Sequence, residues 1–309
     1  MGNSNLTNAK KAKNDEFYTC LTDIEKEMRH YKAFFKDKIV YCNCDDARES
    51  NFFKYFSLNF EHLGLKKLIC TGYKEGGNGV VLVYEGDKNG NRIVDDEEIT
   101  IKEFKGNGDF RSEECIEFLK EADVVVTNPP FSLFREYVAQ LMEYGKKFLI
   151  IGSMNAITYK EIFPYIKNNE LWLGMNYVKD FVQPNGEIKK FGNINWYTNI
   201  PHNKRNTELD LYKKYNEIEY PKYDNYDAIE VSKVANIPID YKDIMGVPIT
   251  FLDKYCPTQF EIVGMSAGNS AVNHFGDKAN YSKHPNDRGG CGVVNGERVY
   301  ARFLIKIRA

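Results

Sequence analysis

The chain has 309 residues, of which 42% are hydrophobic, with 42 basic and 44 acidic side chains. That length fits one large domain or two small ones. No apolar run approaches the roughly 18 residues that a membrane helix needs, and the start lacks the apolar core of a signal peptide, so we expect a soluble cytoplasmic protein without a membrane partner. The formal charge of −2 excludes a strongly basic protein that coats nucleic acid, but leaves local basic patches open.

The cysteine pattern disfavours a disulfide framework and a zinc site, because the seven cysteines contain no CxxC pair. We therefore expect no metal. Asp87 to Glu98 nearly fits a calcium loop, but Arg92 stands where that loop needs glycine. A hairpin turn at Asn89-Gly90 explains the same residues.

Helix and strand patterns begin after a polar arm at residues 1–14, which lacks hydrophobic periodicity and is predicted to be mobile. Thr22 and Glu25 form a capping box, and apolar residues at helical spacing predict a helix that ends near Lys36. An apolar strand pattern at 39–41 follows. A helix between Ser50 and Gly64 and a strand at 67–70 come next.

Apolar runs at 124–126 and 148–151 predict two more buried strands, with a helix over 132–144 between them. This alternation predicts an α/β fold with a doubly wound, mostly parallel sheet, in a domain of residues 15–170. Residues 79–105 interrupt the alternation as an inserted hairpin. Seven of the ten prolines follow residue 170, so we expect a smaller mixed domain over 171–309.

The most informative motif is Asn128-Pro129-Pro130-Phe131, directly after the predicted strand 124–126. Ligands of open α/β sheets bind at the carboxyl ends of strands. Two prolines fix the backbone, so a carbonyl and the Asn128 side-chain oxygen can converge on one amino group, and Phe131 can stack on its ring. Accepting both N–H groups would expose the nitrogen lone pair for attack. The alternative is a rigid loop that leads into a helix, and the position after a central strand favours the functional interpretation.

Asn128 to Phe131 resembles motif IV of S-adenosylmethionine-dependent amino-methyltransferases, in particular those that act on adenine in DNA. Asp15 to Thr19 is similar to the family segment that lies against the methionine part of the cofactor. Asp109-Phe110 is similar to the site that holds the cofactor adenine. Cys42 to Asp46 and Gly192 to Asn199 are similar to one branch of the family, the EcoRI-type adenine-specific methyltransferases.

The resemblance to this branch covers residues 15–309 and implies S-adenosylmethionine as cofactor and double-stranded DNA as substrate. It implies that the domain of 15–170 binds the cofactor and that 171–309 recognises the target. A cognate restriction endonuclease is an expected partner, without a stable complex. The cofactor-binding candidates are Phe17, Tyr18, Thr19, Tyr41, Cys42, Asn43, Asp45, Cys70, Thr71, Asp109, Phe110 and Asn128.

One departure from the general methyltransferase pattern concerns the turn after the first strand, where glycines usually let the backbone approach the cofactor. Residues 42–46 contain no glycine. Either small side chains suffice there or cofactor contact is made differently, and the carboxylate that binds the ribose stays open. Cys42 and Cys44 are interpreted as two small thiols flanking a turn rather than as metal ligands.

An adenine amino group is paired inside the duplex, so the target base must flip into the site and stack on aromatic side chains. Phe131 is one such surface, and Trp196 or Tyr197 is a candidate for the other. A buried strand position explains Trp196 equally well. Between residues 278 and 309, seven basic side chains stand against two acidic ones. The candidates for DNA contact there and at 202–206 are Lys204, Arg205, Lys283, Arg288, Arg298 and Arg302, although each alone could be a solvated surface charge.

The motif and the resemblance together imply a site-specific DNA adenine methyltransferase that methylates the exocyclic amino nitrogen of a flipped adenine, in restriction-modification, as an orphan enzyme or in a phage. Methylation of RNA or of a protein glutamine is an alternative within the enzyme class. A catalytically inactive DNA-binding subunit is an alternative of another class.

Overall fold

The structure is a computed structural model that describes residues 18–44, 46–182, 187–268 and 279–308. The predicted arm, Phe17 and Asp45 lie outside the described residues. The chain divides into two units, Met1–Met154 with Gly174–Ile200, and Asn155–Leu173 with Pro201–Ala309. We refer to them as the sheet unit and the carboxyl-terminal unit.

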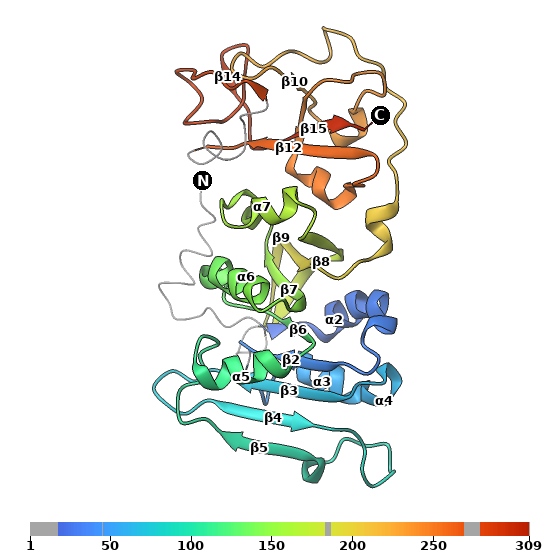
Figure 1. Cartoon of the computed structure of the whole chain (residues 1–309), viewed down its shortest axis with the longest axis vertical. Helices are drawn as coiled ribbons and strands as arrows, with labels where there is room; N and C mark the ends of the chain where they lie inside the picture. Colours follow the sequence, from blue (N-terminus) through green and yellow to red (C-terminus); the bar gives the residue numbers. More distant parts are fainter. Residues whose placement is uncertain (1–17, 45, 183–186, 269–278, 309) are drawn as a thin grey trace. The chain divides into compact units, whose positions relative to one another are not determined.

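A large mixed sheet forms the sheet unit, with nine strands among the described residues in the order β1-β8-β9-β7-β6-β2-β3-β4-β5 (Figure 1). The central strands β7, β6, β2 and β3 are parallel, and antiparallel strands flank them. This arrangement confirms the predicted α/β fold. The strands are β1 Tyr18–Thr19, β2 Ile39–Cys42, β3 Lys67–Gly72, β4 Val80–Tyr84, β5 Ile99–Glu103, β6 Val124–Thr127, β7 Lys147–Ser153, β8 Trp172–Val182 and β9 Ile188–Thr198.

Helices connect the parallel strands, and α3, α5 and α6 pack on β3, β2 and β7. Ser50 caps α3 by accepting hydrogen bonds from the backbone N–H groups of Phe52 and Phe53, and Gly64 ends α4 in the left-handed conformation. The helices up to residue 158 are α2 Leu21–Met28, η1 Arg29–Phe34, α3 Asn51–Leu58, α4 Phe60–Leu63, η2 Asp96–Glu98, α5 Glu113–Glu121, η3 Phe131–Leu133, α6 Phe134–Glu143 and η4 Met154–Thr158.

The strand order reverses between β2 and β6. From β2 the chain continues through α3 to β3 on one side, and from β6 it continues through α6 to β7 on the other. In an open α/β sheet, such a reversal separates the loops at the carboxyl ends of the two strands and forms the ligand-binding crevice. The residues that follow β2 and β6 therefore define the candidate site.

The predicted boundary at residue 170 differs from the structure, because β8 and β9 belong to the large sheet. β9 pairs antiparallel with β7, with Tyr197 opposite Ile150 and Trp196 opposite Ile151, and β8 carries β1. Covering the otherwise open edge of β7 satisfies the backbone groups of a fully buried strand. The inserted hairpin consists of β4 and β5, which extend the other edge beyond β3.

The carboxyl-terminal unit contains a smaller sheet, whose described strands follow the order β10-β11-β15-β12. Phe251 packs edge-on against Phe260, and Phe163 stacks on Phe303, which gives this unit an aromatic core of its own. Its elements are α7 Phe163–Lys167, η5 Asn203–Asn206, β10 Ile229–Glu230, η6 Val234–Asn236, β11 Met245–Pro248, η7 Ile249–Lys254, β12 Phe260–Ser266, β13 Val293–Val294, β14 Glu297–Arg298 and β15 Arg302–Ile307.

Candidate active site

The Asn-Pro-Pro-Phe loop lies at the carboxyl end of β6, at the strand-order reversal. Asn128 is half-buried, Pro129 is buried and Pro130 is exposed. Phe131 opens η3 and is partly buried against the core of the sheet unit, so part of its ring stays accessible. The loop therefore presents an amide, proline carbonyls and an aromatic face together at one strand end.

A hydrogen-bond network joins this loop to the turn after β2. The Thr127 hydroxyl donates to the backbone oxygen of Asn43, and the Tyr137 hydroxyl donates to the Asn43 side-chain oxygen. All three residues are buried. Burial, together with the nearby Cys44 thiol and Tyr41, raises the pKa of Tyr137 well above its ordinary value, so its hydroxyl stays protonated and donates. Asn43 thus ties the end of β2 to the residue that precedes Asn128.

Sequence reasoning missed Tyr137, which lies on α6 one helical turn from the start of that helix. A tyrosine among apolar residues at helical spacing is typical of a core position, and its partner Asn43 is 94 residues away in the chain. No local pattern could have revealed this pair. The only signal in the sequence was the motif at Asn128, which indicates that the residues packed around it help to form the site.

The turn after β2 takes the backbone conformation that glycine usually provides. Cys44 has a φ of 69°, in the left-handed region, although it is not glycine. The Asp46 carboxylate accepts a hydrogen bond of 3.0 Å from the backbone N–H of Arg48 and orders the next residues. Cys44 thus takes up, without being glycine, a conformation in which glycine is the commonest residue.

The cofactor candidates at the ends of β2 and β3 are largely internal. The hydroxyls of Tyr41 and Thr71 share a hydrogen bond of 2.9 Å, and both side chains are buried. Cys42 and Cys70 are buried as well. These buried side chains fix the two strand ends. Only the backbone groups of these residues are then left to contact a ligand.

Asp109 and Phe110 are held against both β3 and α6. A Cβ atom on Gly108 would lie 2.4 Å from the Gly72 oxygen, so only glycine lets this loop touch the end of β3. The Phe110 ring packs edge-on against Tyr137 with ring centroids 5.0 Å apart. Hydrogen bonds from Arg111 lower the pKa of Asp109, so its carboxylate is ionised at neutral pH.

Tyr18 and Thr19 form the short strand β1, opposite Val182 and Phe181 of β8. The Asn51 side chain donates a hydrogen bond of 2.8 Å to the Thr19 carbonyl. Asn51 is the first residue of α3, which follows the turn after β2. The segment predicted to lie against the cofactor is therefore anchored to the helix that leaves the candidate site.

Trp196 and Tyr197 are fully buried on β9, and the predicted base-stacking role of either residue is therefore corrected. Both side chains are 0% exposed. Trp196 packs edge-on with Phe52, while Tyr197 packs on Phe134 and donates a hydrogen bond of 2.8 Å to the Ser153 carbonyl. Side chains packed over the sheet, Phe52 among them for Trp196 and Phe134 for Tyr197, cover both rings, which leaves neither with a face open to a flipped base.

The basic candidates differ in how available their charges are. The Arg302 guanidinium is 2.7 Å from the Glu230 carboxylate, and the two side chains are only 14% and 10% exposed. Lys204 forms an ion pair with Asp253. Each charge is paired with a carboxylate, so Arg302 and Lys204 are less available to a phosphate than the other candidates, and their DNA-binding role stays a prediction. The candidates that stay exposed are Lys283, Arg288 and Arg298, whereas Arg205 is half-buried.

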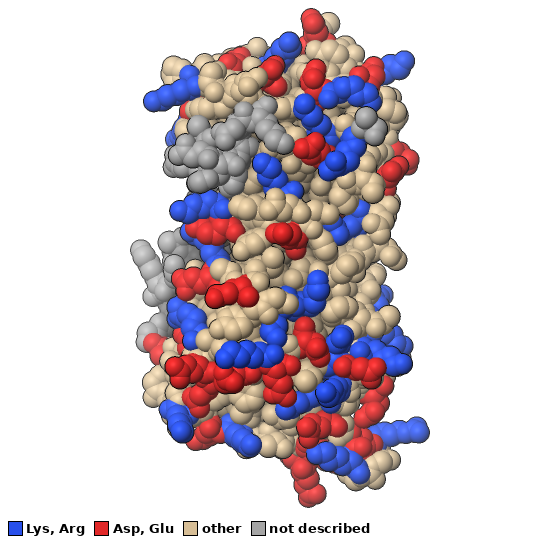
Figure 2. All heavy atoms as spheres, viewed as in Figure 1, with Lys and Arg blue, Asp and Glu red and all other residues tan. Residues whose placement is uncertain are grey.

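Acidic side chains gather over α5, whose first turn carries Glu113 and Glu114 (Figure 2). Such a surface repels the phosphates of a nucleic acid.

Among the described residues, we find no helix with the length and apolar character of a membrane span. No group of three His, Cys, Asp or Glu side chains in the described ranges is arranged to hold a metal ion.

The fold and the site together are those of a methyltransferase that acts on an amino group. The family described as "Adenine-specific methyltransferase EcoRI" matches residues 5–308, and the chain belongs to that family. A methyltransferase requires a methyl donor.

Three curated relatives match nearly the whole chain. The Type II methyltransferase M.EcoRI of Escherichia coli is 47% identical, over 98% of this chain and 96% of its own length. M.MgeORF184P of Mycoplasma genitalium is 40% identical, over 96% of this chain and 97% of its own, and M.MpnI of Mycoplasma pneumoniae is 39% identical, over 97% of each. A proposed RNA methyltransferase from Pyrococcus horikoshii resembles 57% of the chain and 80% of its own length, with a TM-score of 0.28 and 13% identity, too distant to support any argument.

Proposed function

We propose that the protein transfers the methyl group of S-adenosylmethionine to the exocyclic amino nitrogen of an adenine flipped out of double-stranded DNA. The single observation that carries this proposal is the Asn128 to Phe131 loop, held at the strand-order reversal by the Thr127–Asn43–Tyr137 network. The relatives' designation as Type II methyltransferases supports DNA as the substrate. The proposal includes a role in restriction-modification beside a cognate endonuclease, with which no stable complex is expected.

Asn128 and the proline carbonyls supply the chemistry that the amino group needs. The Asn128 side-chain oxygen and a carbonyl of the rigid Asn-Pro-Pro backbone each accept one N–H of the adenine amino group. Accepting hydrogen bonds from both N–H groups draws the nitrogen lone pair out of conjugation with the ring. Phe131 stacks on the base and fixes its plane. Holding the nitrogen at attack distance can contribute roughly 7–11 kcal/mol to lowering the barrier.

The residues at the three strand ends fit the methyl donor. Cys44 adopts the left-handed backbone conformation that glycine adopts most readily, and its side chain is small, so the turn can follow a tight path although it lacks glycine. Phe110 is a buried ring that packs against Tyr137 and would stand behind the adenine part, and Tyr18-Thr19 flank the helix that leaves the site. When bound, S-adenosylmethionine supplies an electrophilic methyl group on a sulfonium.

The test is methyl transfer by the purified full-length chain from radiolabelled S-adenosylmethionine to duplex DNA. Asn128→Ala removes one of the two acceptors, so we expect transfer to fall by about 10²-fold or more, as for the loss of one preorganised hydrogen-bonding group in other active sites. Ser132→Ala, at an exposed position of η3 directly after the motif, is the matched control and should keep wild-type transfer.

Undiminished transfer by Asn128→Ala would refute the assignment of the site. Digesting the labelled product separates the substrate classes, because label released only by a ribonuclease or a protease would indicate RNA or protein. Calorimetry that detects no binding of S-adenosylmethionine would indicate an inactive DNA-binding subunit.

A further inference from the structure

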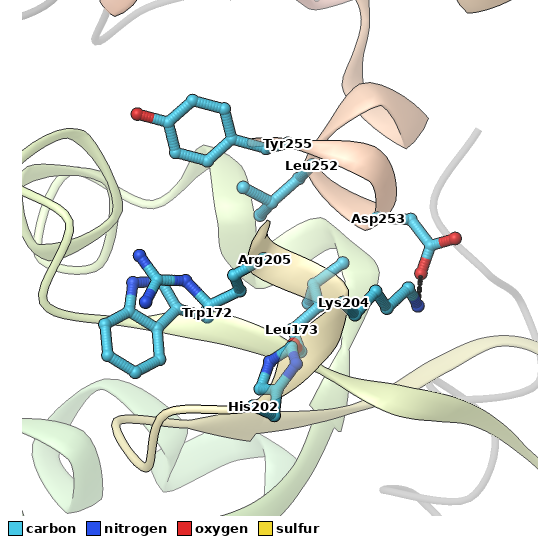
Figure 3. Close-up of a pocket in the computed structure, with 8 residues that line it drawn as sticks. All are labelled: Trp172, Leu173, His202, Lys204, Arg205, Leu252, Asp253 and Tyr255. Carbon is cyan, nitrogen blue, oxygen red and sulfur yellow. Dashed lines mark hydrogen bonds and ion pairs between the residues drawn. The ribbon is translucent and has the colours of Figure 1, made fainter. Parts of the chain in front are cut away.

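A pocket in the carboxyl-terminal unit is built around an arginine that lies on a tryptophan ring (Figure 3). The guanidinium carbon of Arg205 is 3.3 Å from the centroid of the Trp172 ring, which is stacking distance. Arg205 comes from η5, and Trp172 is the first residue of β8. Leu252 and Tyr255 line the pocket from η7 and the residue that follows it.

Asn169 fixes both members of the stack. The Trp172 indole N–H donates to the Asn169 side-chain oxygen at 3.1 Å, and the Arg205 guanidinium donates to the same oxygen. Asn169 has a φ of 64°, a left-handed conformation that asparagine tolerates better than most residues. One short side chain therefore orients the guanidinium before any ligand arrives, which lowers the entropy cost of binding.

The charge of Arg205 is not compensated within the described part of the chain. The contacts that the described residues offer it are the Trp172 ring and the neutral amide of Asn169, and none of the described ion pairs includes it. The neighbouring Lys204 is neutralised by Asp253. Burial lowers the pKa of Arg205, yet a guanidinium stays charged at neutral pH. A half-buried cation without a counter-charge favours the entry of an anion.

A second arginine acts on the same pocket. Burial raises the pKa of Tyr255, while the nearby charges of Arg308 and Arg205 counter that rise. Arg308 is exposed, and its guanidinium donates a hydrogen bond of 2.8 Å to the Pro257 carbonyl. The Arg308 and Arg205 guanidinium groups and the Glu261 carboxylate thus all act on Tyr255, so two positive charges face one negative charge around it.

We propose that this pocket binds a phosphodiester group of the DNA backbone through Arg205. The inference rests on the proposed function, because it takes DNA as the substrate. Stacking on Trp172 occupies one face of the guanidinium and leaves N–H groups at its edge, and two parallel N–H groups match two phosphate oxygens. The sequence predicts the same DNA-binding role for Arg205 and Lys204. The proposal distinguishes them, because Arg205 binds a phosphate and Lys204 pairs with Asp253.

The test measures the salt dependence of DNA binding with the full-length chain and a mixed-sequence duplex. Each phosphate that a cation neutralises adds about 0.9 to the slope of log affinity against log salt concentration. We expect Arg205→Gln to lower the slope by about one such unit. We expect Arg205→Lys to keep most of the slope but to bind more weakly, because a lysine lacks the planar fork and the stack. The second variant keeps the test decisive if Arg205→Gln folds poorly.

Lys254→Gln is the matched control, because it removes an exposed positive charge from η7, two residues from Leu252 in the pocket lining. It should change the slope by less than half as much as Arg205→Gln and should leave methyl transfer intact. An Arg205→Gln slope equal to that of wild type, or to that of Lys254→Gln, would overturn the proposal.

Two further measurements separate the sources of phosphate and the two proposals. Inorganic phosphate at constant ionic strength should not raise the melting temperature of the wild-type protein. If it does, and if Arg205→Gln abolishes the rise but leaves the salt slope of DNA binding unchanged, the pocket binds a free anion and the DNA contact is overturned. If the wild-type protein methylates DNA but Arg205→Gln has the wild-type salt slope, only the proposed phosphate contact is refuted. Failure of wild type to methylate DNA would refute the proposed function.

Discussion

Removing the Tyr137 hydroxyl is expected to weaken both the sheet unit and its activity. Tyr137→Phe keeps the ring, and with it the edge-on contact to Phe110, but deletes the hydrogen bond to Asn43. Because Asn43 is 3% exposed, its side-chain oxygen would lose a donor that water cannot easily replace. An orphaned buried acceptor costs about 1–3 kcal/mol of unfolding free energy. For a unit of this size, each kcal/mol lowers the melting temperature by roughly 2–4 °C.

The expected loss of activity follows from the same geometry. Asn43 also accepts a hydrogen bond from Thr127, which immediately precedes Asn128. A looser Asn43 lets the loop drift from attack geometry, and each 1.4 kcal/mol of lost positioning slows the reaction about tenfold. We therefore expect kcat for methyl transfer to fall by about tenfold, with a smaller change in KM for DNA.

The measurements are steady-state methyl transfer and urea unfolding, with Tyr84→Phe as the matched control. Tyr84 lies on β4 of the same sheet, and its hydroxyl has no hydrogen bond within the described ranges, so its loss should change stability by less than about 0.5 kcal/mol. If Tyr137→Phe loses stability as expected but keeps kcat within twofold of wild type, the network is structural only and does not position Asn128.

Three further predictions follow from single contacts. Gly108 has a φ of 78°, and an added Cβ would lie 2.4 Å from the Gly72 oxygen, so Gly108→Ala should lose more than about 1 kcal/mol of stability in urea unfolding and should bind S-adenosylmethionine more weakly in calorimetry. Gly90→Ala is the control, because Gly90 has a φ of 79° but open space around it and therefore reports the backbone strain alone. Arg302→Gln should cost about 3–5 kcal/mol in urea unfolding because it leaves the buried Glu230 charge unpaired, while Arg298→Gln, at an exposed position, should stay within about 0.5 kcal/mol and weaken DNA binding. Burial raises the pKa of Asp287, but hydrogen bonds from Tyr281, His284 and Gly289 outweigh this and hold it at about 2, so its stabilisation should be present above pH about 4 and lost as the pH falls toward 2, and the stability difference between wild type and Asp287→Asn should shrink over that range in thermal melts.

The central part of the fold was predictable because its signals are local. Runs such as 124–126 are apolar throughout, as expected for parallel strands covered on both faces, and Ser50 and Gly64 mark helix ends with specific hydrogen bonds or backbone conformations. The motif at Asn128 was located for the same reason. The motif directly follows the apolar run of a strand, so neighbouring residues in the chain are enough to locate it.

Features that depend on distant pairs were not predictable. β8 and β9 join the sheet through backbone pairing with β7 and β1, and the abundance of prolines beyond residue 170 pointed instead to a separate domain. Arg302 looked like one of several surface charges, because its partner Glu230 lies 72 residues away. Trp196 looked as suitable for stacking as for burial until its neighbours across the sheet were known.

The turn after β2 shows how a departure from a glycine pattern can be accommodated by the surrounding contacts. A side chain in the left-handed region costs roughly 1–2 kcal/mol, so Cys44 needs support from its surroundings. The preceding residue, Asn43, accepts two hydrogen bonds, from Thr127 and Tyr137, each of which stabilises by about 0.5–1.5 kcal/mol and together offset that strain. The contacts that hold the turn after β2 are therefore the same contacts that hold the Asn128 loop. Because the two halves of the site share one network, a perturbation of Tyr137 should loosen both, and a glycine at position 44 would free the turn from that dependence without freeing the loop.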